Sequence, residues 1–181
     1  MMKRIIAITG TPGVGKTTIS ERLARTLGNA ELIRANDVVK ERKLYSSRSK
    51  DGAMIVKMGE LEAEINRRAA SSKSDYVIIE GHLLCDISIM HAVAVVMREH
   101  PAILLKRLKK RKYGRQKIED NIVSEAIDYC GVNASRNYGT VYEIAAGGSA
   151  LRKIADIARG KRIKANDIEM LGELNGVLDL L

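Results

Sequence analysis

The sequence predicts an α/β fold, a parallel sheet with helices on both faces, and two observations carry this prediction. Short apolar runs rich in β-branched residues alternate along the chain with helical patterns, which is typical of parallel strands joined by helices. A glycine-rich loop separates the first such run from the first helical pattern. At 181 residues and 45% hydrophobic, the chain suits one domain with a core of its own. The strand candidates are residues 3–9, 30–34, 75–79, 92–97 and 141–144.

The glycine-rich loop fits a phosphate-binding motif. Residues 10–17 read Gly-Thr-Pro-Gly-Val-Gly-Lys-Thr and match G-x-x-x-x-G-K-[ST], the P-loop. Ile19, Leu23 and Leu27 follow at helical spacing, and Gly28 is a natural helix end. An ordinary glycine-rich turn after a strand would rarely match every fixed position in a chain of this length. The sequence therefore predicts binding of a nucleoside triphosphate.

The motif assigns a role to each residue type. Its glycines let backbone N–H groups approach phosphate oxygens, and the helix beginning near Lys16 adds its positive dipole end. Lys16 can reach the β- and γ-phosphates, and the Thr17 hydroxyl can ligate Mg²⁺. We expect ATP to be bound by Gly13, Val14, Gly15, Lys16, Thr17 and Thr18.

A second candidate group stands at the end of the run 75–79. Glu80 follows this strand directly, at the sheet edge where α/β proteins bind ligands, and can hold the shell of a magnesium ion. His82 points the same general way and can orient water or accept a proton. The alternatives are that Glu80 caps a neighbouring helix and that His82 is a structural histidine.

A third group is basic. Arg107 and Arg111 lie four residues apart, on one face of a helix that Pro101 opens. Phosphoryl transfer needs cations that cover the charge on the migrating group, and the arginine guanidinium suits this role. Taken alone, this Lys/Arg run could equally be a solvated face or an RNA contact, since the net charge is +9. Trp and Phe are absent, so a stacking platform for single-stranded bases is not expected.

The rest of the composition is less specific. The sequence has no apolar run of about 20 residues and no signal peptide, so we expect a cytoplasmic protein, or a nuclear one if the source is eukaryotic. Cys85 and Cys130 are far apart in sequence and show no C-x-x-C spacing. We expect both to be buried reduced thiols.

Shorter patterns predict the remaining elements. Asn36 or Asp37 should cap a helix reaching about Leu44, and residues 45–52 have the composition of a mobile surface loop. Residues 1–160 form the predicted P-loop domain. Residues 161–181 are predicted to be a basic linker and an amphipathic helix that packs on the body or offers a partner surface. Apolar residues at helical spacing are Met58, Leu61, Ile65 and Ala69 in one helix, and Ile118, Ile122, Ala126 and Tyr129 in one long helix. A last stripe comprises Ile168, Leu171, Leu174 or Asn175, Leu178 and Leu181.

Five motifs occur in an order that resembles one family. They are Gly10–Thr18, Asn36-Asp37 with Leu44-Tyr45, Ile79-Glu80-Gly81-His82, Arg107-x-x-x-Arg111-Lys112-Tyr113 and Lys117-Ile118-x-x-Asn121. Together they resemble the adenylate kinase 6 family, the coilin-interacting nuclear ATPase and its archaeal relatives. The resemblance covers roughly residues 3–158 and leaves the tail unaccounted for.

The resemblance implies a P-loop three-layer sandwich with a five-stranded sheet in the order 2-3-1-4-5. It also implies a substrate-nucleotide segment near residues 34–57 and a small lid near 110–120, where Arg111 contacts ATP. The implied activities are AMP phosphorylation and ATP hydrolysis, together with maturation of small-subunit ribosomal RNA beside a ribosomal platform protein. Two residues depart from the family pattern, Lys57 at a usually acidic position and Lys112 in place of glycine.

The leading hypothesis is Mg²⁺-dependent transfer of the ATP γ-phosphate to a nucleoside monophosphate, with AMP as the expected acceptor. Lys16, Glu80, His82, Arg107 and Arg111 are the catalytic candidates, and Thr17 and Glu80 the metal ligands. Arg34 and Asp37 are candidates for binding the acceptor. The alternatives are an ATPase that assists ribosome assembly, with little kinase activity, and another P-loop kinase of small metabolites.

Overall fold

The computed structural model describes residues 3–48, 54–111, 113–163 and 176–177, and its main feature is a five-stranded parallel sheet. The strands lie in the order β2-β5-β1-β6-β7, and every neighbouring pair is parallel. Counted among themselves in chain order, these five strands are arranged 2-3-1-4-5, which confirms the predicted fold class. Their bounds are β1 (Arg4–Thr9), β2 (Ala30–Arg34), β5 (Tyr76–Glu80), β6 (Ala92–Arg98) and β7 (Val141–Ala145).

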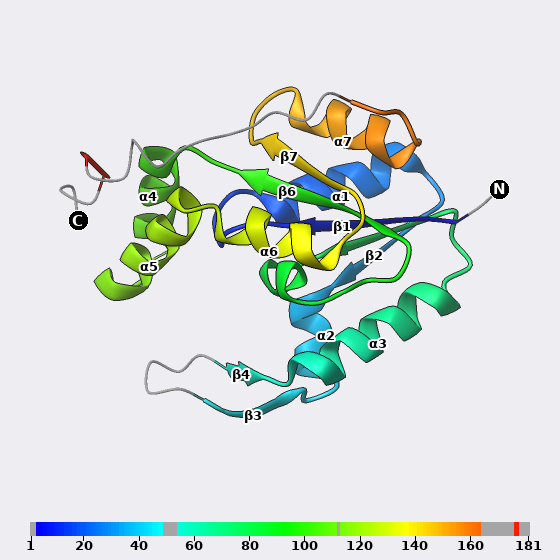
Figure 1. Cartoon of the computed structure of the whole chain (residues 1–181), viewed down its shortest axis with the longest axis horizontal. Helices are drawn as coiled ribbons and strands as arrows, with labels where there is room; N and C mark the ends of the chain where they lie inside the picture. Colours follow the sequence, from blue (N-terminus) through cyan, green and yellow to red (C-terminus); the bar gives the residue numbers. More distant parts are fainter. Residues whose placement is uncertain (1–2, 49–53, 112, 164–175, 178–181) are drawn as a thin grey trace.

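Helices cover both faces of the sheet (Figure 1). A short 3₁₀ helix, η1 (His82–Asp86), follows β5 at the sheet edge. The α-helices are α1 (Lys16–Leu27), α2 (Ala35–Glu41), α3 (Met58–Ser71), α4 (Pro101–Lys110), α5 (Arg115–Ala126), α6 (Tyr129–Asn137) and α7 (Ala150–Ala158).

The alternation of side chains along the strands divides the interior into two cores. In β1, Ile6 and Ile8 face one core and Ala7 faces the other. Helices α1, α4, α5 and α7 contribute to the first core, and α2, α3, η1 and α6 to the second. Because both faces are covered, a strand needs apolar residues at nearly every position, which explains the continuous apolar runs in the sequence.

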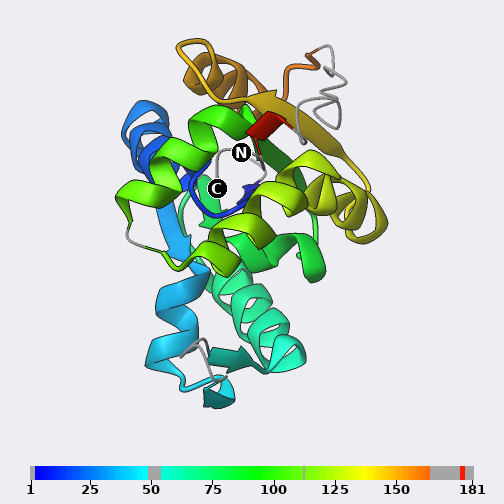
Figure 2. The ribbon, with the colours of Figure 1, turned by 90° about the vertical axis from the view of Figure 1, so that its left-hand side faces the viewer.

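The carboxyl ends of the strands meet at one edge of the sheet. Figure 2 looks at this edge, with the connection from β1 to α1 near its centre. Helix α4 lies above that connection in this view, and α2 and α3 lie below it. Parallel topology thus brings segments that are distant in sequence to the same edge.

Residues 45–48, predicted as part of a surface loop, form a strand. This strand, β3 (Tyr45–Arg48), pairs antiparallel with β4 (Met54–Val56) in a two-stranded sheet. The loop prediction was wrong for these four residues because pairing with β4, the next strand along the chain, outweighs the local preference of Ser and Arg for loops. Residues 49–53 lie outside the described part of the chain.

The single helix predicted through Ile118 and Tyr129 is in fact two helices. Helix α5 ends at Ala126, and Asp128 takes a left-handed backbone conformation with φ of 55°. The Asp128 carboxylate accepts a hydrogen bond from the N–H of Gly131 at 3.1 Å and pairs with Arg98 at 2.6 Å. These two contacts fix the break between α5 and α6, and apolar spacing alone carries no sign of them.

Helix boundaries follow the predictions elsewhere, with one exception. Gly28, with φ of 80°, ends α1, and Pro101 opens α4 as expected. The predicted bounds of α2 were wrong at both ends. The helix begins at Ala35, before Asn36 and Asp37, with no side-chain cap, and it ends at Glu41 rather than near Leu44.

Most of the tail lies outside the described residues, including the whole stripe from Ile168 to Leu181 that the sequence analysis singled out. Val177 is described, and it is buried against the first core. No helix in the described ranges is long and apolar enough to span a membrane.

Candidate active site

The P-loop between β1 and α1 needs glycine at its fixed positions for steric reasons. Gly10 and Gly13 have φ of 131° and 104°, where residues with a side chain are strained. A Cβ at Gly13 would lie 2.7 Å from the Leu104 Cδ1, and one at Gly10 would collide with the carbonyl of Met97. The loop therefore packs closely against β6 and α4, and α1 begins directly after it at Lys16.

Lys16 is folded back onto the loop. Its ammonium donates hydrogen bonds to the carbonyl oxygens of Gly10 at 2.7 Å and of Thr11 at 3.0 Å, and the residue is 8% exposed. Burial lowers the pKa of Lys16 to about 8, against the opposing influence of nearby groups that include Glu80. A buried cation of this kind gains strongly from an anion beside it, as a phosphate would be.

Thr17 and Glu80, the two predicted metal ligands, face each other. The Thr17 hydroxyl lies 3.4 Å from both carboxylate oxygens of Glu80, at the carboxyl end of β5. Burial raises the pKa of Glu80, and the charge of Lys16 opposes this rise. A hydroxyl and a carboxylate are the oxygen ligands that Mg²⁺ prefers. Within the described ranges no group of three His, Cys, Asp or Glu side chains could hold a metal, so phosphate and water would complete its coordination.

His82 begins η1, two residues after Glu80. Burial, assisted by the charge of Lys16, lowers the pKa of His82 to about 4, so its imidazole is neutral near pH 7. A neutral imidazole can accept a proton or orient a water molecule. Gly81 brings this turn close to α2, because a Cβ there would lie 2.7 Å from the Cβ of Ala35.

These groups share one cavity of about 970 Å³, at the upper end of the usual range for small-molecule sites. Helix α5 and the segment before it supply the wall facing the P-loop, with Lys117, Asp120 and Asn121 among its lining residues. Val14 is the one predicted ATP-binding residue that does not line the cavity. It is fully buried, and its N–H donates to the carbonyl of Thr11 at 3.3 Å. The predicted residues that line the cavity are Gly13, Gly15, Lys16, Thr17, Thr18, Glu80, His82 and Arg111.

Arg107 and Arg111, both from the basic end of α4, have different surroundings. Arg111, at the end of α4, lines the cavity and is close enough to Lys16 to affect its pKa. Arg107 lies behind the loop, where its guanidinium donates to the carbonyl of Gly13 at 3.1 Å and pairs with Glu99 at 2.6 Å. Arg107 therefore holds the P-loop from outside the cavity.

The predicted acceptor residues are at the edge of the site. Arg34 pairs with Glu21 of α1 at 2.7 Å, and neither Arg34 nor Asp37 lines the cavity. Both are close enough to Glu80 to influence its pKa. Asn36, which lies between them in sequence, does line the cavity.

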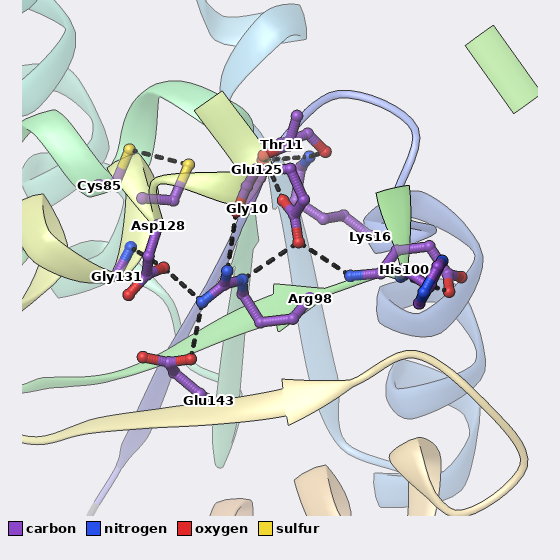
Figure 3. Close-up of polar contacts among 12 residues, drawn as sticks. Gly10, Thr11, Lys16, Cys85, Arg98, His100, Glu125, Asp128, Gly131 and Glu143 are labelled. Atoms are coloured by element: carbon purple, nitrogen blue, oxygen red, sulfur yellow. Dashed lines mark hydrogen bonds and ion pairs between the residues drawn. The ribbon is translucent and has the colours of Figure 1, made fainter. Parts of the chain in front are cut away.

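A buried ionic network beside the P-loop was not predicted (Figure 3). Arg98, 1% exposed, pairs with Glu125 at 3.1 Å, with Asp128 at 2.6 Å and with Glu143 at 2.8 Å. Glu125 also accepts hydrogen bonds from the Thr11 hydroxyl and from the N–H of Glu99. The signal in the sequence was a charged Arg98-Glu99 pair directly after an apolar strand, which a search for motifs passes over.

Asp86 is the centre of another group of polar contacts beside the cavity. Asp86 accepts hydrogen bonds from the hydroxyl of Tyr129 and from the side-chain amide of Asn133, both at 3.0 Å. Asp86 and Tyr129 line the cavity, and their contact joins η1 to α6. Neither residue was predicted to belong to the site.

The sequence is similar to known proteins that were found by comparison with family models and with curated sequences. A family model described as an AAA domain matches residues 6–128. A protein from Pyrococcus furiosus named "Putative adenylate kinase" is 35% identical over 145 residues, which are 77% of this chain and 73% of that protein. A protein of the same name from Archaeoglobus fulgidus is 31% identical over 183 residues, covering 94% and 93% of the two chains.

Solved structures share the fold at low identity. Shikimate kinase from Bacteroides thetaiotaomicron matches with a TM-score of 0.58 and 19% identity, over 87% of this chain and 96% of that one. Shikimate kinase from Acinetobacter baumannii, solved in complex with shikimate, matches with a TM-score of 0.57 and 18% identity, over 90% and 96% of the two chains. At this identity the likeness shows the fold alone.

Proposed function

The chain belongs to the AAA-domain family whose model matches residues 6–128 and to the family of the archaeal proteins named "Putative adenylate kinase", and we propose that it transfers the γ-phosphate of ATP to a nucleoside monophosphate, AMP in the first instance. The observation that carries this proposal is the meeting of Lys16, Thr17, Glu80 and Arg111 around one cavity. These are the kinds of groups that phosphoryl transfer needs, because its catalysis is mostly positioning and charge stabilisation.

In this proposal the P-loop binds the triphosphate of ATP. The Lys16 ammonium exchanges its bonds to the carbonyls of Gly10 and Thr11 for phosphate oxygens, which costs little because the side chain is already held there. Thr17 and Glu80 would hold Mg²⁺, and the ion would supply positive charge next to the phosphates. Arg111 covers the charge of the phosphoryl group as it moves from donor to acceptor.

The acceptor would enter from the side of α2. We propose that residues 34–57 bind it, with Arg34 and Asp37 near Glu80 and with Asn36 lining the cavity. Residues 110–120 would act as a lid, since this segment holds the end of α4 and the first half of α5. Closure of the lid would exclude water from the γ-phosphate.

Slow ATP hydrolysis is a second proposed activity, and the neutral imidazole of His82 beside Glu80 favours it. A neutral histidine in the cavity can orient a water molecule toward the γ-phosphate when no acceptor is present. The resemblance noted above motivates a further proposal, that a small-subunit ribosomal protein or RNA stimulates this hydrolysis.

The proposal is tested by mixing pure protein with Mg-ATP and, in separate reactions, AMP, CMP, GMP, UMP and shikimate. Each reaction is followed by measuring nucleoside diphosphate or phosphorylated acceptor against inorganic phosphate. We expect diphosphate to form fastest with AMP and inorganic phosphate to form slowly without an acceptor. Fast phosphorylation of shikimate and none of any monophosphate would reassign the substrate class. Hydrolysis alone with every acceptor would favour the assembly ATPase.

A further inference from the structure

The two cysteines, 45 residues apart in sequence, meet in the fold. The sulfur of Cys85 lies 3.5 Å from the sulfur of Cys130, and both thiols are free. Cys85 stands in η1, after the strand that carries Glu80, and Cys130 stands in the first turn of α6. In Figure 3 a dashed line joins the sulfur of Cys85 to a second sulfur atom, which marks this contact. No other cysteine occurs in the chain.

The two thiols differ in access. Cys85 is 1% exposed and does not line the cavity, whereas Cys130, 7% exposed, is among the lining residues. A small reagent that enters the cavity therefore reaches Cys130 first. A nucleotide bound at the P-loop would stand in the same cavity and would restrict this approach.

The surroundings also make Cys130 the more reactive of the pair. Its position in the first turn of α6 exposes it to the positive end of the helix dipole, and Lys16 is close enough for each group to affect the pKa of the other. A hydrogen bond from the Cys85 thiol lowers the pKa of Cys130, and Lys16 adds to this, while the carboxylates of Glu125 and Asp86 and its own burial oppose it. The pKa of the Cys85 thiol is raised by that same hydrogen bond and by burial.

We propose that Cys85 and Cys130 are a redox modification site in the wall of the nucleotide cavity, oxidised by a peroxide to a reversible disulfide. The Cys130 thiolate attacks one oxygen of hydrogen peroxide, which becomes a sulfenic acid on Cys130 while hydroxide leaves and takes up a proton. The Cys85 sulfur then attacks the Cys130 sulfur, and a second water leaves with the proton of Cys85. Two thiols and one peroxide thus give one disulfide and two water molecules.

The disulfide would alter the cavity that the proposed kinase uses. The two sulfurs must approach from 3.5 Å to about 2.05 Å, which draws the start of α6 and the η1 turn together. Both segments line the cavity, through Tyr129 and Cys130 on one side and through His82 and Asp86 on the other. A shift of about 1 Å in such a site can slow a reaction ~100-fold, so we expect turnover to fall at least ~10-fold on oxidation. This consequence rests on the proposed function, whereas formation of the disulfide does not.

The chemical step is tested on the full chain by mass spectrometry. Wild-type protein is treated with hydrogen peroxide, with and without saturating Mg-ATP, and the peptides are mapped without reduction. We expect an intramolecular link between Cys85 and Cys130, a mass lower by two hydrogen atoms, slower formation with Mg-ATP, and reversal by dithiothreitol. Oxidation of Cys130 to sulfinic acid with no link, or links only between chains, would overturn the pairing. A rate of linking unaffected by Mg-ATP would overturn the route through the cavity.

Two single variants test the assignment of roles. In C85S, Cys130 should still form a sulfenic acid that dimedone captures, and Mg-ATP should slow its capture. In C130S, Cys85 should remain unmodified over the same time, because the cavity does not reach it. Faster modification in C130S than in C85S would show that Cys85 attacks the peroxide and would contradict the proposal.

The effect on function is measured separately, as phosphoryl transfer by each protein relative to its own untreated sample. Wild type should lose activity as the link forms and recover it on reduction. A fully linked protein with unchanged turnover would overturn the functional consequence while leaving the modification site intact. If no phosphoryl transfer occurs before oxidation, the proposed function fails and the mass result still decides the disulfide.

Discussion

Thr11 of the P-loop donates a hydrogen bond to the buried carboxylate of Glu125, which lies 114 residues further along the chain. Glu125 belongs to α5, and the same helix lines the nucleotide cavity with Lys117, Asp120 and Asn121. The contact therefore joins the P-loop to a helix that lines the same cavity. Arg98 completes the arrangement by pairing with Glu125 at the end of β6.

Replacing Glu125 by Gln should destabilise the protein by about 3 kcal/mol. The change leaves Arg98 without one of its buried partners and removes the charge that Thr11 and the N–H of Glu99 now contact. Urea denaturation measures the difference. Glu60→Gln is the matched control, because Glu60 forms an exposed pair with Lys57 and should contribute less than about 1 kcal/mol. Equal effects of the two substitutions would mean that the buried network adds no more stability than a surface pair.

Glu64 should make stability depend on pH at acid values. Hydrogen bonds from Arg67, Arg68 and Arg42 hold the pKa of this carboxyl well below its ordinary value of 4.5. A lowered pKa in the folded state means that the unfolded chain binds protons first as pH falls. The stabilisation is therefore complete above about pH 4.5 and is lost progressively below it.

The measurement for Glu64 compares wild type with Glu64→Gln by urea denaturation at pH 7 and at pH 3. The stability difference between the two proteins should be smaller at pH 3. A difference that does not change between these two pH values would contradict the lowered pKa. Glu60→Gln again serves as the reference, since Glu60 and Lys57 form an exposed ion pair.

Arg111 and Arg107 should give different kinetic signatures. Arg111 lines the cavity, so we expect Arg111→Ala to lower kcat at least ~10-fold with a smaller effect on ATP binding. Arg107 holds the Gly13 carbonyl and Glu99 outside the cavity, so Arg107→Ala should mainly weaken ATP binding by loosening the loop. Steady-state kinetics and direct ATP titration separate the two effects. The same changes in kcat and in ATP binding for both variants would contradict the different roles assigned to the two arginines.

His82 should matter more for hydrolysis than for transfer. Its neutral imidazole can orient water, whereas a bound monophosphate supplies its own nucleophile. In His82→Ala, release of inorganic phosphate without acceptor should therefore fall further than formation of diphosphate with AMP. Equal loss of both rates would indicate a structural role, or one common to both steps.

Much of this architecture could be predicted from local sequence. The strands could be predicted from continuous apolar runs because the sheet is covered on both faces. The site could be predicted from the P-loop motif because the loop has no room for side chains at its glycines. Glu80 and His82 could be predicted because parallel strands end at the same edge. Arg111 could be predicted because its motif follows the P-loop and the Glu80 motif in the order that the resembled family shows.

What could not be predicted depends on contacts between distant residues. Nothing local to Glu125 indicates that it meets Thr11, and nothing local to Cys85 indicates Cys130. The break at Asp128 has the same origin, since its partners are Arg98 and the N–H of Gly131. Arg107 was predicted to act in the cavity because it shares a helix face with Arg111, but its guanidinium contacts the Gly13 carbonyl and does not line the cavity.

The central claim, that Lys16 anchors ATP for phosphoryl transfer, is tested most directly by Lys16→Ala. Formation of diphosphate from Mg-ATP and AMP is measured for this variant, for wild type and for Lys106→Ala, which removes an exposed lysine of α4 outside the cavity. Loss of the Lys16 cation should slow transfer at least ~100-fold, a few kcal/mol of transition-state stabilisation, while Lys106→Ala stays near wild type. Transfer by a folded Lys16→Ala protein at a rate near wild type would contradict the account.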